Sequence, residues 1–200
     1  LTGNGIRTGA QYISGLQDDR EVWTQGKRIK DVTSEPGMSR GVSSLAGFLD
    51  KQHEKKYRDK VTYVDEDGIR CPLSFKTPKS KQDILDRGKA YYEWATWSHG
   101  MFGRTPDYKN ASLMSFSAAR SFLDKGTVGK ADFSQNMLNF YNHARTNDQI
   151  LTHTLINPSV SHKQAAAGIY NATVALHVVK ETDAGIIVSG ARLLATLGPF

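Results

Sequence analysis

The sequence predicts an α+β protein whose helical part comes first and whose antiparallel β part comes second. Apolar residues recur at helical spacing through most of the chain before residue 150, with two short β-prone pairs between them. After Pro158 the periodicity changes, and β-branched runs surround a turn. We therefore expect a mainly helical domain over residues 1–152 and a β domain over residues 153–200, with the boundary near residues 148–157.

The chain should open with a short helix followed by a β-hairpin. Residues 21–24 and 28–32 are β-prone runs, and Gln25-Gly26 between them is a turn signal. A helix is expected over residues 42–57, because Val42, Leu45, Phe48 and Leu49 fall on one face.

A second hairpin and a long helix should come next. Strands are expected at 61–64 and 69–73, joined by the turn residues Asp-Glu-Asp-Gly. Pro72 lacks an N–H and marks an edge strand. Ser80, three residues before Asp83, indicates a capping box. The helix it opens should run to about His99 and carry Ile84, Leu85, Tyr92 and Trp94.

Two more helices and a last hairpin complete the predicted fold. The helices are expected over roughly 110–124 and 131–148, the second with a core face formed by Phe133, Met137, Phe140, Tyr141 and Ala144. Residues 174–179 and 186–188 should pair through the turn at 182–185. A final strand to about Thr196 has little chain left to pair with, so the β domain is expected to be incomplete.

Composition limits the classes of function. No run approaches the ~20 apolar residues of a membrane span, so no membrane association is expected. Residues 1–5 show no secretory pattern. Cys71 is the only cysteine, which excludes an intrachain disulfide and a cysteine metal cluster and fits a cytoplasmic location. The net charge of +6 is scattered among acidic residues, whereas a nucleic-acid surface needs a basic stripe.

Three motifs contain the most informative polar residues. Gly-Arg-Thr-Pro-Asp-Tyr at 103–108 holds Arg104 and Tyr108 around the rigid Pro106. Thr-His-Thr-Leu-Ile-Asn-Pro at 152–158 holds His153, and a third motif spans 181–192. Arginine, tyrosine and histidine can together bind a phenolic oxygen and handle its proton. Each also has a structural interpretation: Arg104 can pair with Asp107 or cap a helix, Tyr108 can pack, and His153 can be a core histidine.

In this order the motifs resemble the 4-hydroxyphenylacetate 3-monooxygenase family, the oxygenase component of a two-component flavin-dependent system. The resemblance covers nearly the whole chain, from residues 7–13 and 19–23 to residues 194–197. Members of the family are considerably longer, so the chain is similar to their N-terminal portion. The resemblance implies the architecture of acyl-CoA dehydrogenases, with residues 153–200 as the start of a flavin-binding β-sheet domain.

The activity that the resemblance implies is hydroxylation of a phenol similar to 4-hydroxyphenylacetate, ortho to its OH, with reduced FAD and O2, in aromatic hydrocarbon catabolism. A separate NADH-dependent flavin reductase would supply the flavin, since no dinucleotide fingerprint occurs. A homo-oligomer, dimer or tetramer, is expected. Chlorophenol or nitrophenol monooxygenases and a non-catalytic assembly fragment remain alternatives. The related 4-hydroxybutyryl-CoA dehydratase is rejected, because its iron–sulfur cluster needs several cysteines.

The resemblance also implies the site residues. Arg104, Tyr108 and His153 match the catalytic residues around the phenol oxygen. The chain departs from the family after Pro158, where relatives carry Gln and Asp-Arg in place of Ser159 and Ser161-His162. No histidine pair has the spacing of a zinc site, so no metal is expected. Substrate contacts are expected from Arg104, Thr105, Pro106, Asp107, Tyr108 and His153, and FAD contacts from His153, Thr154, Leu155, Ser159, Val160, Ser161, His162 and Thr196.

Overall fold

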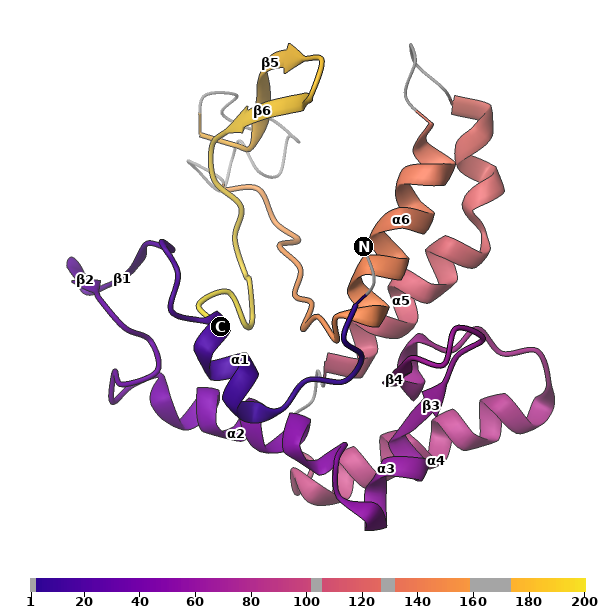
Figure 1. The fold of residues 1–200 in the computed structure, drawn as a ribbon. Helices are drawn as coiled ribbons and strands as arrows, with labels where there is room; N and C mark the ends of the chain where they lie inside the picture. The colour runs from indigo at the N-terminus through magenta and orange to yellow at the C-terminus, as the bar shows by residue number, and fades with distance from the viewer. Residues whose placement is uncertain (1–2, 102–105, 127–131, 159–173) are drawn as a thin grey trace. The chain divides into compact units, whose positions relative to one another are not determined.

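The computed structural model describes residues 3–101, 106–126, 132–158 and 174–200 of the chain. The chain divides into two compact units, a helical unit of Leu1–Leu151 with Pro199–Phe200 and a second unit of Thr152–Gly198. Their elements are traced in Figure 1. In the described parts of the chain, no helix has the length and apolar character needed to cross a membrane.

In its described residues, the helical unit contains α-helices, two short hairpins and two 3-10 helices. Each hairpin is antiparallel and forms its own two-stranded sheet. The elements in chain order are α1 (Gly9–Gly15), β1 (Val22–Thr24), β2 (Lys27–Ile29), α2 (Ser39–Lys51), α3 (Lys55–Val61), β3 (Thr62–Val64), β4 (Arg70–Pro72), η1 (Leu73–Phe75), α4 (Lys81–Trp97), α5 (Pro106–Ala118), η2 (Arg120–Gly126) and α6 (Phe133–Thr146).

Side-chain caps fix where several helices begin. Thr8 caps α1 in a full capping box with Gln11. Ser80 caps α4, as predicted, and accepts from the Asp83 amide at 3.2 Å. The Asp83 carboxylate then binds the amide of Lys79 at 2.9 Å, one residue before the position that a capping box would use. Asp132 caps α6 by accepting from the amide of Gln135 at 2.8 Å.

The single helix predicted over residues 42–57 is wrong, because the structure has two helices with a break at residues 52–54. Long-range contacts cause the break. Gln52 is buried and its amide group binds Asp148, which lies 96 residues away. The ring of His53 contacts the carbonyl of Arg7 at 3.0 Å. The predicted apolar face of α2 is confirmed, since Val42, Leu45, Phe48 and Leu49 are all buried.

Two apolar clusters among the described residues form part of the core of the helical unit. In the first, Phe48 of α2 meets Trp94 of α4 edge to face, with ring centroids 5.3 Å apart. The second joins Phe75 of η1 to Leu113 of α5 and Ala144 of α6. Burial of each large apolar side chain stabilises the fold by roughly 1.5–3 kcal/mol. The first cluster consists of Phe48, Val61, Leu73, Ala90 and Trp94.

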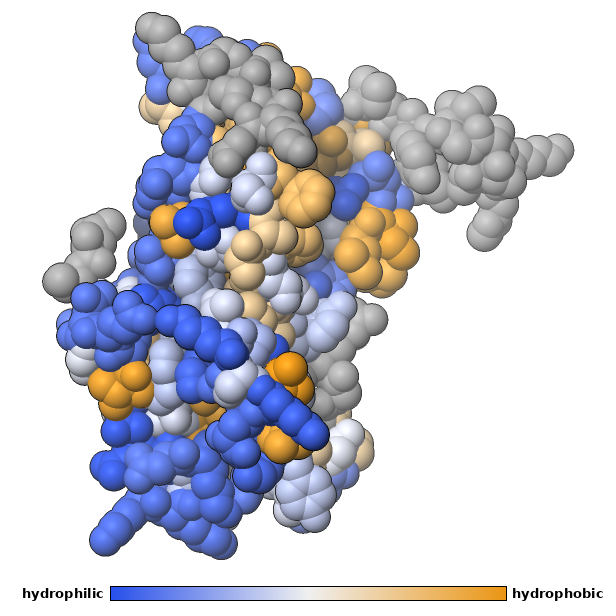
Figure 2. Space-filling view, turned by 90° about the vertical axis from the view of Figure 1, so that its right-hand side faces the viewer, coloured by the Kyte–Doolittle hydropathy of each residue, from blue (hydrophilic) through white to orange (hydrophobic). Residues whose placement is uncertain are grey.

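Several predicted positions differ from the structure. The helix predicted over 110–124 begins earlier, at Pro106, and becomes a 3-10 helix at Arg120, because proline suits the first turn of a helix. On α6, Met137, Tyr141 and Ala144 face the core as predicted, whereas Phe133 and Phe140 are 41% and 51% exposed. On α4, which carries Ile84, Leu85, Tyr92 and Trp94 as predicted, only Trp94 of these four is buried. Figure 2 shows hydrophobic side chains at the surface between hydrophilic ones.

The second unit contains the predicted hairpin, β5 (His177–Thr182) and β6 (Gly185–Ser189), antiparallel and with an irregular register between Val178 and Lys180. All side chains of both strands are exposed. The segment after Gly190 does find partners within this unit, through bridges between Leu193 and Ile156 and between Ala191 and Ala175. The predicted fold class is confirmed: helices with small hairpins come first and antiparallel pairing follows.

Candidate active site

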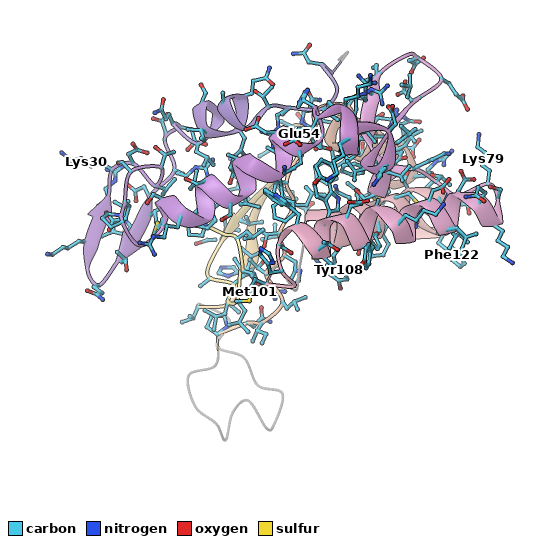
Figure 3. All side chains as sticks on the ribbon, turned by 90° about the horizontal axis from the view of Figure 1, so that it is seen from below. Lys30, Glu54, Lys79, Met101, Tyr108 and Phe122 are labelled. Atoms are coloured by element: carbon cyan, nitrogen blue, oxygen red, sulfur yellow. The ribbon has the colours of Figure 1, made fainter. Side chains whose placement is uncertain are left out.

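The first motif is only partly placed. Arg104 and Thr105 lie outside the described residues, and Pro106 and Asp107 form the start of α5. Tyr108 follows in the first turn of that helix, where its side chain is 53% exposed (Figure 3). The ammonium group of Lys109 lies 4.6 Å from the centre of the Tyr108 ring. The phenol group of Tyr108 is therefore presented on the surface of the helical unit.

Buried contacts fix α5 immediately after Tyr108. Asn110 is 2% exposed and donates from Nδ2 to the hydroxyl of Ser74 in η1 at 3.1 Å. Leu113 and Met114 are buried one turn further along. The other polar atom of the Asn110 amide, Oδ1, has no hydrogen-bond partner among the described residues. These contacts hold the turn that carries Tyr108 in one orientation on the helical unit.

A second anchor lies where α6 ends. The carboxyl oxygen Oδ2 of Asp148 accepts from the amide of Arg7 at 3.0 Å and from Nε2 of Gln52 at 2.7 Å. The Arg7 guanidinium also donates to the carbonyl of Asp148 at 3.0 Å. Burial raises the pKa of the Asp148 carboxyl, and the hydrogen bonds from Arg7 and Gln52 only partly oppose that shift. Asp148 and Gln52 line a cavity of about 20 Å³ together with Asn110.

The second motif lies in an irregular segment of the second unit. His153 is half-buried there, and Thr154 and Leu155 are exposed. The Arg192 guanidinium, from the end of the third motif, donates to the carbonyls of Thr154 and Leu155 at 3.0 and 3.2 Å. It also donates to the side chain of Asn157. The structure therefore brings the second and third motifs together.

Two further contacts extend this junction on both sides of Thr154 and Leu155, through residues that follow Arg192. The amide of Leu193 donates to the carbonyl of Ile156 at 2.8 Å, and the amide of Leu197 approaches the hydroxyl of Thr152 at 3.5 Å. Thr196, one of the predicted FAD contacts, is exposed next to this second contact. Ser159, Val160, Ser161 and His162 lie outside the described residues.

The chemistry of this junction fits an anionic dinucleotide cofactor. Thr154 and Thr196 offer exposed hydroxyls, and the Arg192 cation has no carboxylate partner in the described parts of the chain. A permanent cation and free hydroxyls suit a diphosphate and a ribose. For metals, no group of three His, Cys, Asp or Glu side chains comes together among the residues described. Burial raises the pKa of the Cys71 thiol to about 12, so Cys71 stays a neutral core residue.

The three predicted catalytic residues are distributed over both units. Tyr108 lies in the helical unit, His153 lies in the second unit, and Arg104 lies outside the described residues. Their convergence on one cavity therefore stays a prediction. Sequence reasoning gave no role to Asp148, Asn110 or Arg192. Only Arg192 had a local signal, since it is a charged residue within the apolar end of the third motif.

Comparison with known proteins gives consistent matches along the chain. A family model described as 4-hydroxyphenylacetate 3-hydroxylase N terminal matches residues 8–200. The oxygenase component of 4-hydroxyphenylacetate 3-monooxygenase from Thermus thermophilus is 38% identical over 191 residues, which are 95% of this chain and 38% of that protein. The oxygenase component of 4-nitrophenol 2-monooxygenase from a Rhodococcus species is 35% identical over 199 residues, or 96% of this chain and 36% of that protein.

Solved structures agree with these matches. The oxygenase component of 4-hydroxyphenylacetate 3-monooxygenase in complex with FAD and 4-hydroxyphenylacetate superposes with a TM-score of 0.83 and 37% identity, over 94% of this chain and 38% of that one. An archaeal 4-hydroxybutyryl-CoA dehydratase gives a TM-score of 0.75 at 17% identity, over 94% of this chain and 37% of that one, and so shares the fold. The chain spans little more than a third of the length of the relatives that it matches.

Proposed function

The chain belongs to the 4-hydroxyphenylacetate 3-hydroxylase family as its N-terminal part, and on this premise we propose that the full-length protein is the oxygenase component of a two-component flavin-dependent monooxygenase. It would use reduced FAD and O2 to hydroxylate a phenol ortho to its OH. The observation that carries the proposal is the likeness to the enzyme solved with FAD and 4-hydroxyphenylacetate, over 94% of this chain. The junction of the second and third motifs at Arg192 supports it.

Each catalytic residue has a chemical role in this proposal. Arg104 keeps its charge at any physiological pH and stabilises negative charge on the phenol oxygen. His153 accepts or returns the phenol proton near neutral pH. Tyr108 donates a hydrogen bond to the same oxygen and orients the ring. Thr105, Pro106 and Asp107, which lie between Arg104 and Tyr108 in the sequence, are the further proposed substrate contacts.

The flavin, when bound, supplies the reducing equivalents and activates oxygen. The groups proposed to hold it are the backbone and side chains of residues 153–155 and 159–162 and the hydroxyl of Thr196. Their further task is to exclude water, which would divert the reaction to hydrogen peroxide. A separate NADH-dependent flavin reductase is the proposed partner, and a cytoplasmic homo-oligomer, a dimer or tetramer, is the proposed assembly.

A nitrophenol is the second candidate substrate, because the 4-nitrophenol 2-monooxygenase component from Rhodococcus matches the chain almost as well as the relatives named for 4-hydroxyphenylacetate. Both substrates carry a phenol OH, so the roles of Arg104, Tyr108 and His153 are the same for either. A non-catalytic assembly fragment is the third possibility, and it predicts no flavin binding at all.

The test begins with anaerobic titration of the full-length protein with reduced FAD. Oxygen is then admitted in the presence of 4-hydroxyphenylacetate, 4-nitrophenol or 4-chlorophenol, with isotopically labelled O2. We expect one labelled oxygen atom in the product, and no catalytic oxidation of NADH until the reductase is added. Failure to bind reduced FAD, or direct NADH oxidation at a catalytic rate, would contradict the proposal.

Substitutions then test the residue roles. Arg104→Ala should slow hydroxylation about a hundredfold or more, since loss of one preorganised donor costs roughly 3 kcal/mol in the transition state. His153→Ala should lower turnover, shift its pH dependence and increase wasted hydrogen peroxide. Arg28→Ala removes an exposed cation of β2 and serves as the control, with unchanged hydroxylation. Wild-type rates and coupling in both Arg104→Ala and His153→Ala would overturn the assignment.

A further inference from the structure

We propose that Arg192 is a positioning residue of the flavin site, and that its guanidinium group imposes the backbone shape of residues 154–157. The consequence for flavin rests on the proposed function, whereas the shape itself is a property of the chain. Arg192 is not one of the predicted catalytic residues, and it can position the backbone without contacting the substrate.

The guanidinium group uses most of its donors on this one segment. Nε and Nη2 both donate to the carbonyl of Thr154, at 3.3 and 3.0 Å, and Nη2 also donates to the carbonyl of Leu155 at 3.2 Å. Nη1 donates to the side-chain oxygen of Asn157. Four interactions thus reach acceptors on three residues. A planar fork can make them together, whereas a lysine ammonium is a single point on a flexible stem.

These contacts require an unusual backbone path. In a regular strand, successive residues face opposite sides. Here two consecutive carbonyls, those of Thr154 and Leu155, reach the same guanidinium group. The next carbonyl, that of Ile156, accepts from the amide of Leu193. Three carbonyls in a row are therefore bound by Arg192 and Leu193, and Arg192 binds the first two.

The charged guanidinium group of Arg192 donates to neutral oxygen acceptors. Within the described ranges it forms no ion pair with a carboxylate. A fully buried arginine is almost never found without a partner, but Arg192 is only partly buried. The cation beside Thr154 raises the electrostatic potential of a segment that is proposed to face an anionic diphosphate. Substitution of Arg192 can separate the effect of its hydrogen-bond geometry from the effect of its charge.

The experiment uses the full-length protein in four forms: wild type, Arg192→Lys, Arg192→Met and the control Asp183→Asn. The control removes an exposed charge from the turn between β5 and β6 in the same unit. The first measurement is amide hydrogen exchange of Leu193 without flavin, because this amide donates to Ile156 and reports opening of the segment. Both Arg192 variants should lose about ten- to a hundredfold of protection, as expected for lost bonds to a charged group. The control should match wild type.

The second measurement is the dissociation constant of reduced FAD under anaerobic conditions. If Arg192 acts by position, Arg192→Lys and Arg192→Met should both weaken binding about tenfold or more, although the lysine keeps the charge. Wild-type affinity in Arg192→Lys, or wild-type Leu193 protection in Arg192→Met, would overturn the proposal. If wild type itself binds no reduced FAD, the proposed function fails, and the exchange data alone decide the role of Arg192.

Discussion

The helical unit and the second unit bury their apolar side chains to different extents. The helical unit buries two apolar clusters and closes a polar anchor around Asp148. In the second unit, Ala175 is the only buried residue among those described, while Val178, Ile186 and Ile187 are 49–62% exposed. One part of the chain therefore carries its own core, and the other presents apolar surface to its surroundings.

The hairpin of the second unit needs other residues packed against it to be stable. A two-stranded hairpin has too little core to be stable alone. Apolar residues on both faces of β5 and β6 are typical of strands that are covered on both sides. We therefore expect these faces to be covered in the assembled full-length protein. The predicted FAD contacts lie in the unit that depends on such cover.

The first prediction compares the two units directly. Phe48→Ala should destabilise the helical unit by about 3–5 kcal/mol in both the 200-residue chain and the full-length protein, because it empties a closed core. Ile187→Ala should cost little in the 200-residue chain, where the side chain is 50% exposed. In the full-length protein it should cost roughly 2–5 kcal/mol, as for a covered core residue.

Urea unfolding of both chain lengths measures these changes in the free energy of unfolding. Val64→Ala is the matched control, since Val64 is also 50% exposed but belongs to the helical unit. Its cost should be small in either length. An equal cost of Ile187→Ala in both lengths would remove the contrast between the units.

The second prediction concerns charge inside the helical unit. The Asp65 and Arg145 side chains form an ion pair that is only 7% and 12% exposed. Burial alone would raise the pKa of Asp65, but hydrogen bonds from the Ile69 amide and from Arg145 hold it below its usual value. Arg145→Met leaves that carboxylate buried without its partner and should cost on the order of 3 kcal/mol or more.

Lys89→Met is the control for this pair. Lys89 and Asp86 form an ion pair whose side chains are 69% and 44% exposed, so its removal should cost under about 1 kcal/mol. Both variants are compared by urea unfolding of the full-length protein. Equal and small costs would show that water reaches Asp65 and that the helical unit is less closed than its geometry indicates.

Features that depend on neighbouring residues could be predicted from the sequence, whereas features that depend on distant residues could not. The apolar face of α2, the N-cap at Ser80 and the turn at 182–185 depend on residues a few positions apart, and they are confirmed. The break at residues 52–54 depends on Arg7 and Asp148, and no local pattern reports it. On α6, helical spacing identified apolar residues but not the side that has a partner, so Phe133 and Phe140 were misassigned.

The site was predictable only as far as its motifs reach. Family motifs supplied Arg104, Tyr108 and His153, because each lies in a short recognisable segment. The anchors of those segments were not predictable, since Asn110 binds Ser74 from 36 residues away and Arg192 binds Thr154 from 38 residues away. The residues that anchor these segments depend on long-range contacts, which a short sequence motif does not report.

The third prediction separates chemistry from packing in the helical unit. Tyr108→Phe should leave the free energy of unfolding nearly unchanged, because the side chain is 53% exposed. Hydroxylation should fall roughly fivefold, as expected for one lost hydrogen bond of about 1 kcal/mol. Steady-state hydroxylation and urea unfolding of the same preparation provide both values. A large loss of stability with unchanged turnover would instead make Tyr108 a packing residue.

The fourth and smallest effect concerns the anchor at the end of the helical unit. Burial raises the pKa of the Asp148 carboxyl above its ordinary value of 3.8, so the folded state binds the proton more readily than the unfolded state. The stability that this group contributes is complete below the unfolded pKa and is lost as pH rises through the raised folded pKa. Asp148→Asn removes this titration, while an amide oxygen can still accept from Arg7 and Gln52.

We therefore expect the free energy of unfolding of Asp148→Asn to vary less with pH above pH 3.8 than that of wild type. At pH 7 the variant should equal wild type in stability or exceed it by up to about 1 kcal/mol. Asp132→Asn is the control, because asparagine also caps a helix and should leave the profile unchanged. Unfolding free energies from pH 4 to 8 provide the comparison. A loss of several kcal/mol at pH 7 in Asp148→Asn would mean that the ionised carboxylate, paired with the nearby Arg7 charge, stabilises the unit. The helical unit would then be anchored by charge, as its Asp65–Arg145 pair is, and not by a neutral hydrogen-bonded carboxyl.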